Sequence, residues 1–240
     1  MSGHSKWANI AKRKGAQDAK KANVFTKLAR NITVAAQKGS DPDMNFSLRL
    51  AIDKARSASM PKDNIERAIA KASGTGDGAR LEQMFYEVFG PEGIGILVEA
   101  LTDNKNRTTS EIRAILNKYG GTLAAANAVK WMFKHQGVIR VGLTDVENKD
   151  ALTLELELID AGADDVVEEE NGLTIYSSFE NFEKVKKFVE QKGLVVDYAE
   201  MEWVAKDKVE KNEESNAKIE KLVDMIEEKD DVSGVYTNIA

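Results

Sequence analysis

Side chains that bind phosphate are concentrated at the start of this chain. The first 40 residues contain nine Lys and Arg but only one acidic residue, Asp18. Residues 1–72 carry a net charge of +9 and the whole chain carries −6, so the remainder holds about −15. A field this one-sided draws polyanions to one end of a protein, whereas ordinary solvated surfaces mix both signs. Nucleic acid is therefore the expected partner, and a solvated charged helix face is the alternative.

Ten residues of this basic segment are candidate nucleic-acid contacts. His4 can hydrogen-bond a phosphate or a base edge, and Trp7 can stack on an exposed base, a contact worth about 1–3 kcal/mol in single-stranded complexes. Docking of Trp7 onto the neighbouring helices is the alternative for that residue. The other eight candidates are cations expected to meet phosphates: Lys6, Lys12, Arg13, Lys14, Lys20, Lys21, Lys27 and Arg30.

Motifs for catalysis are missing. The chain has two histidines, His4 and His135, and no cysteine, which excludes disulfides, thiolate catalysis and Cys-based zinc sites. No HExxH, GxSxG or GxxxxGK[ST] motif occurs. Acidic pairs such as Asp164-Asp165 and Asp230-Asp231 are typical of a solvated rim, with a divalent-ion site as the alternative. We expect no enzyme activity, no cofactor, no metal and no small-molecule substrate; a hydrolase or metal-dependent enzyme acting between domains is a remote alternative.

Composition and length are those of a globular protein with more than one domain. The chain has 240 residues, of which 42% are hydrophobic and 31% charged. No apolar run approaches the roughly 20 residues that span a bilayer, and no apolar stretch follows the N-terminal charges. We therefore expect a cytoplasmic protein without a membrane partner.

The basic segment is expected to continue into a small helical domain. Apolar residues recur at helical spacing from Phe25 to Ala36, and Gly39 ends that helix. A second helix is predicted from Leu48 to Ala55, and Pro61 opens a third. The Gly-rich stretch SGTGDG then reads as a linker, so residues 1–76 are predicted to form a basic arm and a helical domain.

The rest of the chain is predicted to form two α+β domains, one inserted in the other. The domains expected are residues 77–142 with 206–240, and residues 143–205 as the insertion, because a lone final helix and strand need a partner sheet. Asp150–Gly162 fits a strand or a helix, and we favour the helix. The remaining expected elements are strands at Met84–Phe89 and Gly93–Leu101, a helix at Thr108–Tyr119, two strands, Val129–Phe133 and Val138–Val141, around a Gln136-Gly137 turn, a hairpin of Asp165–Glu170 and Leu173–Ser177, a helix at Phe179–Gln191, a strand at Leu194–Val204, a helix around Ile219–Ile226, and a closing strand at Gly234–Ile239.

A second contact surface is expected in the segment LTDNKNRT. Asn104, Lys105, Asn106 and Arg107 lie where a predicted strand passes into a helix. Polar side chains and the helix N-terminus can meet an anion at such a junction. A capped turn with ordinary surface residues is the alternative.

Several motifs are spread over nearly the whole chain: GHSKW from Gly3, Asn9-Ile10, Arg13-Lys14, AQDAK from Ala16, MPKDNIERAI from Met60, LTDNKNRT from Leu101, Trp131-Met132-Phe133 and VYTN from Val235. Together they resemble the YebC/PmpR family. This resemblance implies a helical N-terminal domain followed by two α+β domains of ferredoxin-like character, and no enzyme activity. It also implies a DNA-binding transcriptional regulator, although the family's mitochondrial relative is a translational activator and members are tied to ribosomes on proline-rich stretches.

The chain departs from the family pattern before Trp131. A loop that commonly reads LGxxGSV is here Leu123–Val129, with Ala124, Asn127 and Ala128 in place of two glycines and a serine. That change puts a backbone contact from this loop to phosphate in doubt. Asn127 can still adopt the left-handed conformation that glycine would supply. DNA and ribosomal RNA both remain possible targets.

Overall fold

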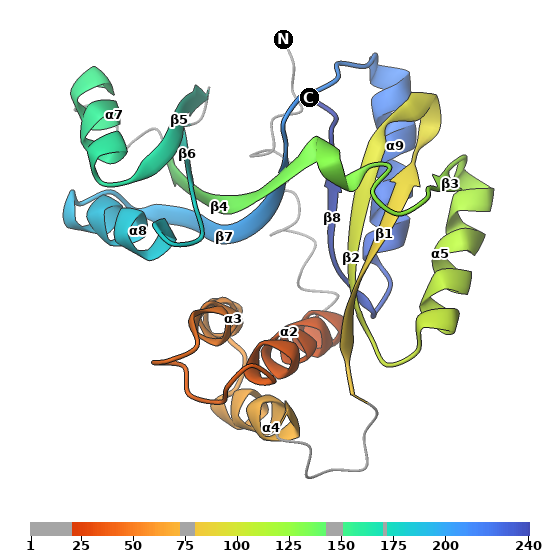
Figure 1. The fold of residues 1–240 in the computed structure, drawn as a ribbon, viewed down its shortest axis with the longest axis horizontal. Coiled ribbons are helices and arrows are strands. Elements are labelled where there is room, and N and C mark those ends of the chain that lie inside the picture. The colour runs from red at the N-terminus through yellow and green to blue at the C-terminus, as the bar shows by residue number, and fades with distance from the viewer. Residues whose placement is uncertain (1–20, 73–79, 143–150, 170–171) are drawn as a thin grey trace. The chain divides into compact units, whose positions relative to one another are not determined.

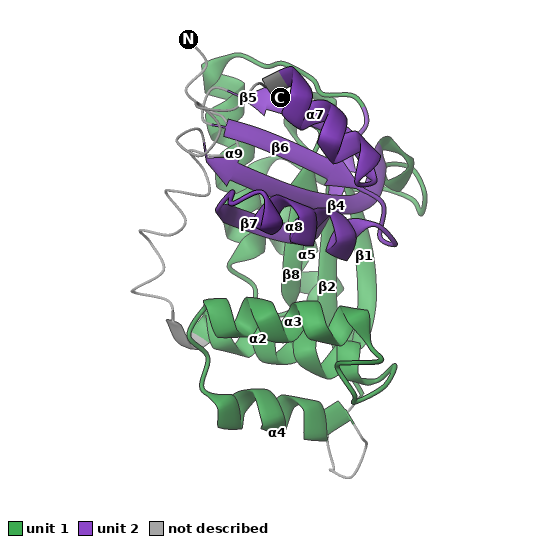
Figure 2. Ribbon diagram, turned by 90° about the vertical axis from the view of Figure 1, so that its left-hand side faces the viewer, with its two compact units in different colours: residues 1–132, 207–240 green, residues 133–206 purple. Residues whose placement is uncertain are grey.

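The computed structural model describes residues 21–72, 80–142, 151–169 and 172–240. The chain divides into two compact units, one of residues 1–132 with 207–240 and the other of residues 133–206 (Figures 1 and 2). Within the described residues, no helix combines the length and apolar character needed to cross a membrane.

Three helices form the N-terminal part of the first unit: α2 (Lys21–Ala36), α3 (Phe46–Ser57) and α4 (Lys62–Ala72). Their apolar faces meet in one core that contains Ile32 and Leu48, both 0% exposed. These helices confirm the spacing argument, while the linker predicted after them lies outside the described residues.

Asn45 connects two of these helices. Its Oδ1 accepts a hydrogen bond from the N–H of Leu48 at 3.1 Å, which caps α3, and its Nδ2 donates to the carbonyl oxygens of Ala35 and Gly39 at 2.8 and 2.7 Å. One amide thus satisfies the open N-terminus of α3 and the open C-terminus of α2.

The first unit continues into a four-stranded antiparallel sheet with the order β3-β1-β2-β8. Even-numbered residues of its central strands, such as Val88 and Val98, point to one face, where α5 (Lys105–Tyr119) and α9 (Glu213–Glu227) pack on them. The final helix and strand therefore complete this sheet, as the sequence predicts. The elements are β1 (Glu82–Phe89), β2 (Gly95–Thr102), α5 (Lys105–Tyr119), β3 (Thr122–Leu123), the 3₁₀ turns η2 (Pro91–Gly93) and η3 (Lys130–Met132), α9 (Glu213–Glu227) and β8 (Val232–Thr237).

The second unit has the ferredoxin-like succession of strand, helix, two strands, helix and strand. Its antiparallel sheet has the order β5-β6-β4-β7. The helix favoured for Asp150–Gly162 is confirmed, and so is the antiparallel pairing of the two hairpin strands. The elements are β4 (Phe133–Gly142), α7 (Ala151–Asp160), β5 (Ala163–Glu169), β6 (Gly172–Ser177), α8 (Phe182–Gln191) and β7 (Val196–Ala205).

The expectation of two strands around Gln136-Gly137 is wrong. β4 runs without a break through these residues and pairs with β6 and β7, so it belongs to the second sheet. Gly137 serves packing, because a Cβ at that position would lie 2.1 Å from Cδ2 of Phe182 on α8. The second unit accordingly begins at Phe133 rather than at residue 143. The expected class, a helical domain followed by two α+β domains with one inserted, is confirmed.

Candidate nucleic-acid interface

Seven of the ten candidate contacts lie outside the described residues: His4, Lys6, Trp7, Lys12, Arg13, Lys14 and Lys20. Lys21 begins α2, but its side chain is also outside the description. Their roles as nucleic-acid contacts stay predictions.

Lys27 and Arg30 on α2 engage other parts of the first unit. Nζ of Lys27 donates to the carbonyl oxygen of Glu227 at 2.5 Å. Nη1 of Arg30 donates to the carbonyl oxygen of Leu101 at 2.9 Å and forms an ion pair with the carboxylate of Asp231. The Arg30 side chain is 22% exposed. Lys27 thus connects the helical domain to the end of α9, and Arg30 connects it to β2 and to the residue before β8. Their contacts with phosphate stay predictions.

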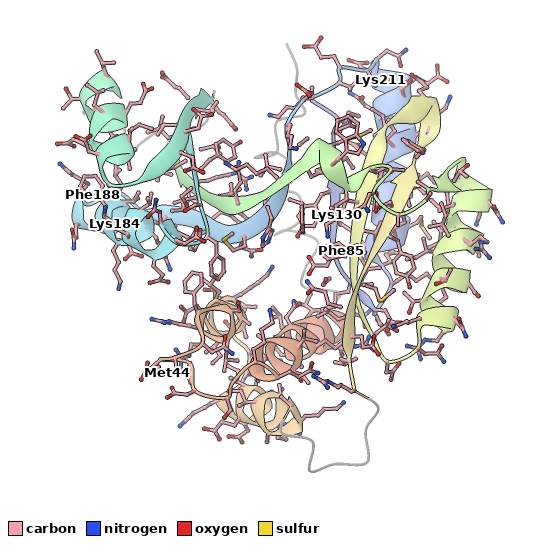
Figure 3. The ribbon with its side chains drawn as sticks, in the orientation of Figure 1. Met44, Phe85, Lys130, Lys184, Phe188 and Lys211 are labelled. Carbon is pink, nitrogen blue, oxygen red and sulfur yellow. The ribbon has the colours of Figure 1, made fainter. Side chains whose placement is uncertain are left out.

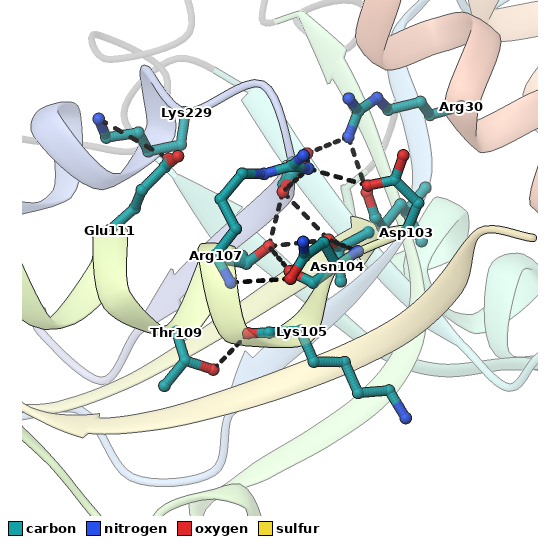
Figure 4. Close-up of polar contacts among 12 residues, drawn as sticks. Arg30, Asp103, Asn104, Lys105, Arg107, Thr109, Glu111 and Lys229 are labelled. Carbon is teal, nitrogen blue, oxygen red and sulfur yellow. Dashed lines mark hydrogen bonds and ion pairs between the residues drawn. The ribbon is translucent and has the colours of Figure 1, made fainter. Parts of the chain in front are cut away.

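Asp231 lies directly before β8 and is the centre of a polar network that includes Arg30 and Arg107. Figure 4 shows these two arginines. The Asp231 side chain is 5% exposed and pairs with both of them, with Arg107 at 2.8 Å from Oδ2. The hydroxyls of Thr108 and Thr102 donate to Oδ2 at 2.6 and 3.1 Å. Burial raises the pKa of Asp231, but hydrogen bonds from Arg107, Thr108 and Arg30 outweigh burial and hold the pKa well below its ordinary value. The carboxylate is thus ionised and satisfied.

The segment LTDNKNRT forms a capped turn at the start of α5 (Figure 4). Oδ1 of Asn104 accepts from the N–H of Arg107 at 3.0 Å, as an N-cap does. The guanidinium of Arg107 reaches Asp231, while Lys105 pairs with Glu82 at 2.7 Å on an exposed surface. Asn106 is exposed. The structure therefore shows a structural role for Asn104 and Arg107, and an anion contact by this segment stays a prediction.

Sequence reasoning missed Glu87, a buried carboxylate on β1. Its Oε1 accepts from the N–H of Asn127 at 2.6 Å, and its Oε2 accepts from the N–H groups of Val129 and Lys130 at 2.6 and 2.7 Å. Burial raises the pKa of Glu87, but the N–H groups of Lys130, Val129 and Asn127 outweigh it, so the net pKa is lowered. The sequence signal is a single charged residue between apolar neighbours, Tyr86 and Val88.

The loop before Trp131 has three features beside its contact with Glu87. Asn127 has φ of 64°, which confirms that it takes the left-handed conformation. The amide groups that a glycine-rich loop could offer to phosphate are bound to Glu87 instead. Nζ of Lys130 lies 4.1 Å from the centre of the Phe85 ring (Figure 3), a cation–π contact made by the same residue whose N–H binds Glu87.

The helices α3 and α4 carry both signs of charge, with six Lys and Arg against three Asp and Glu. Lys62 pairs with Glu66 at 3.4 Å, and Arg56 approaches Asp53 at 3.6 Å. Arg67 donates to the side chain of Asn64. The helices α3 and α4 therefore mix both signs with a small positive excess, whereas residues 1–20 contain five Lys and Arg and one acidic residue.

Among the described residues, no group of three or more His, Asp or Glu side chains is arranged to hold a metal ion. The two carboxylates of Asp230-Asp231 have different surroundings: Asp231 binds two arginines, and Asp230 is exposed. Asp164 pairs with Lys134 at 3.0 Å.

Comparison with known proteins gives matches along nearly the whole chain. Residues 5–75 match the model described as the TACO1/YebC protein N-terminal domain, and residues 81–239 match the TACO1/YebC second and third domain. A protein of Bacillus licheniformis named "Probable transcriptional regulatory protein" is 47% identical over 100% of both chains. One of the same name from Caldanaerobacter subterraneus subsp. tengcongensis is 45% identical over 100% of this chain and 98% of its own.

A solved structure has the same fold. The crystal structure of a conserved hypothetical protein from Aquifex aeolicus matches with a TM-score of 0.82 and 37% identity, covering 94% of this chain and 93% of its own. Two family models that cover both the helical domain and the α+β domains, together with full-length relatives above 40% identity, show that the chain belongs to the TACO1/YebC family.

Proposed function

We propose that this protein is a non-enzymatic, nucleic-acid-binding regulator of gene expression, with duplex DNA as its first target, as in a transcriptional regulator. The observation that carries the proposal is the segregation of charge, +9 over residues 1–72 and about −15 over the rest. The names of the relatives from Bacillus and Caldanaerobacter support a regulatory function of this class.

The phosphate contacts are assigned mainly to the segment before α2. Lys27 and Arg30 donate to acceptors within the protein, so fewer of their N–H groups are available to a phosphate. Lys6, Lys12 and Arg13 belong to a segment of 20 residues with five Lys and Arg and one acidic residue. Lys105 and Asn106, which are exposed, are the proposed second contact.

The salt dependence of binding tests this proposal. If about five phosphates are neutralised, log K falls against log salt with a slope near −4.5 for duplex DNA. Fluorescence anisotropy with a labelled duplex at several salt concentrations measures the slope. A flat dependence, or no binding at low salt, would contradict the proposal.

A ribosome-associated translation factor that binds ribosomal RNA is the second candidate, including action at proline-rich stretches. The observation that favours it is the mixed charge on α3 and α4, since the Lys62–Glu66 and Arg56–Asp53 pairs engage cations that a base-reading helix face would present. A cationic segment suits RNA shape as well as a duplex groove. Salt-sensitive cosedimentation with ribosomes, without promoter protection, would select this candidate.

Crosslinking in cells separates the two targets directly. Sequencing both the DNA and the RNA crosslinked to the full-length protein shows which is enriched over a matched uncrosslinked sample. Enrichment of promoter fragments supports the first candidate, and enrichment of ribosomal RNA supports the second.

A further inference from the structure

Trp131 presents an aromatic ring on the surface of the first unit. Its side chain is 60% exposed, compared with 37% for Phe89 and 42% for Phe179. The indole Nε1–H donates to the carbonyl oxygen of Ala128 at 2.9 Å. Because the polar edge of the ring is satisfied by the protein, the exposed part of the indole is apolar and available for stacking.

The backbone that carries Trp131 is held in place on both sides of the ring. Glu87 accepts the N–H groups of Asn127, Val129 and Lys130 at 2.6 to 2.7 Å. Val129 is 0% exposed, and the N–H of Met132 donates to its carbonyl oxygen at 2.9 Å. A ring fixed in this way loses little conformational entropy when a partner binds.

The chain around Trp131 is depleted of negative charge. Residues 112–144 contain five Lys and Arg and no Asp or Glu, although the chain after residue 72 has a net charge of about −15. The residues exposed just before Trp131 are small or uncharged: Ala125, Ala126 and Asn127. A polyanion is therefore not repelled by neighbouring residues of the segment that carries the ring.

We propose that Trp131 is a stacking site for an unpaired base of single-stranded RNA. The inference rests on the proposed nucleic-acid binding and deepens its second candidate, RNA binding, by naming a contact beyond the basic segment. Bases in a duplex are stacked on each other, whereas those of a single strand leave a face open to an aromatic side chain. Glu87 is a positioning residue for this contact, since it holds the loop and touches no ligand.

The test compares two strands with the full-length protein. One is a labelled, unstructured RNA of about 20 nucleotides, and the other has the same backbone with abasic sites. Trp131→Ala should weaken binding of the base-containing strand by about 5-fold or more, while Trp131→Phe keeps most of the affinity. Binding of the abasic strand should be equal for wild type and Trp131→Ala, and the salt slope should not change.

Leu156→Ala is the matched control, because Leu156 on α7 is also 60% exposed and its removal should leave RNA binding unchanged. An equal loss by Trp131→Ala on both strands, an equal loss on duplex DNA, or no loss at all while wild type binds would overturn the stacking site alone. Failure of wild type to bind the RNA strands while it binds duplex DNA would also overturn the stacking site alone. Failure of wild type to bind either RNA or duplex DNA at low salt would overturn the proposed function together with it.

Discussion

At Asp231 a single carboxylate holds the guanidinium groups of Arg30 from α2 and Arg107 from α5. We expect Asp231→Asn to lower the free energy of unfolding by about 2–3 kcal/mol, because two cations and two hydroxyls lose a charged acceptor. Urea unfolding measures the change. Asp230→Asn is the control. The side chain of Asp230 is exposed, so removal of its charge should change the free energy of unfolding by less than about 0.5 kcal/mol.

Acid should weaken this network. The pKa of Asp231 in the folded protein lies below its ordinary value of 3.8, so its contribution is complete above that pH and is lost as the pH falls further. The stability difference between wild type and Asp231→Asn should therefore be constant from pH 7 to about 5 and shrink below about pH 4. A difference that grows on acidification would show that another group is responsible.

We expect the loop that carries Trp131 to depend on Glu87 in the same way. In Glu87→Ala the N–H groups of Asn127, Val129 and Lys130 lose their acceptor, at about 1–3 kcal/mol for each group that stays buried. Faster hydrogen exchange of these three amides is the expected readout. Glu82→Ala on the same strand removes an exposed carboxylate and should leave their exchange unchanged.

At the scale of elements, local patterns predicted most helices and strands, and tertiary contacts decided the exceptions. Apolar spacing identified α2 and α9 because each buries one face of a helix. The sequence predicts a turn at Gly137. Its packing role could not be predicted, because the contact with Phe182 arises only after α8 folds onto the sheet. For the same reason the roles of Glu87 and Arg107 could not be predicted, because their partners are distant in sequence.

The reinterpretation of Gly137 is testable. Gly137→Ala places a methyl group in the volume of the Phe182 ring and should destabilise the second unit by about 1–3 kcal/mol. Phe182→Leu in the same chain should recover part of that loss, because it removes ring atoms from the contact. If Gly137→Ala is neutral in thermal unfolding, packing is not the reason for glycine at this position.

At the scale of the whole molecule, the sequence alone predicts the asymmetry of charge, because charge is additive and needs no fold. The fold changes how it is used. Arg30 and Arg107 pair with Asp231, so two cations that the sequence offers for binding stabilise the first unit instead. This places more of the expected phosphate binding on the residues before α2.

Two triple variants with equal changes of net charge can separate location from total charge. Lys12, Arg13 and Lys14 changed to Gln should remove about three phosphate contacts, which reduces the salt slope on duplex DNA from near −4.5 to near −2. The same change at Lys184, Lys186 and Lys187 on α8 should leave the slope near −4.5. Anisotropy titrations of both variants across salt concentrations measure the slopes. Equal slopes for the two variants would mean that net charge, and not a basic segment at the start of the chain, governs binding.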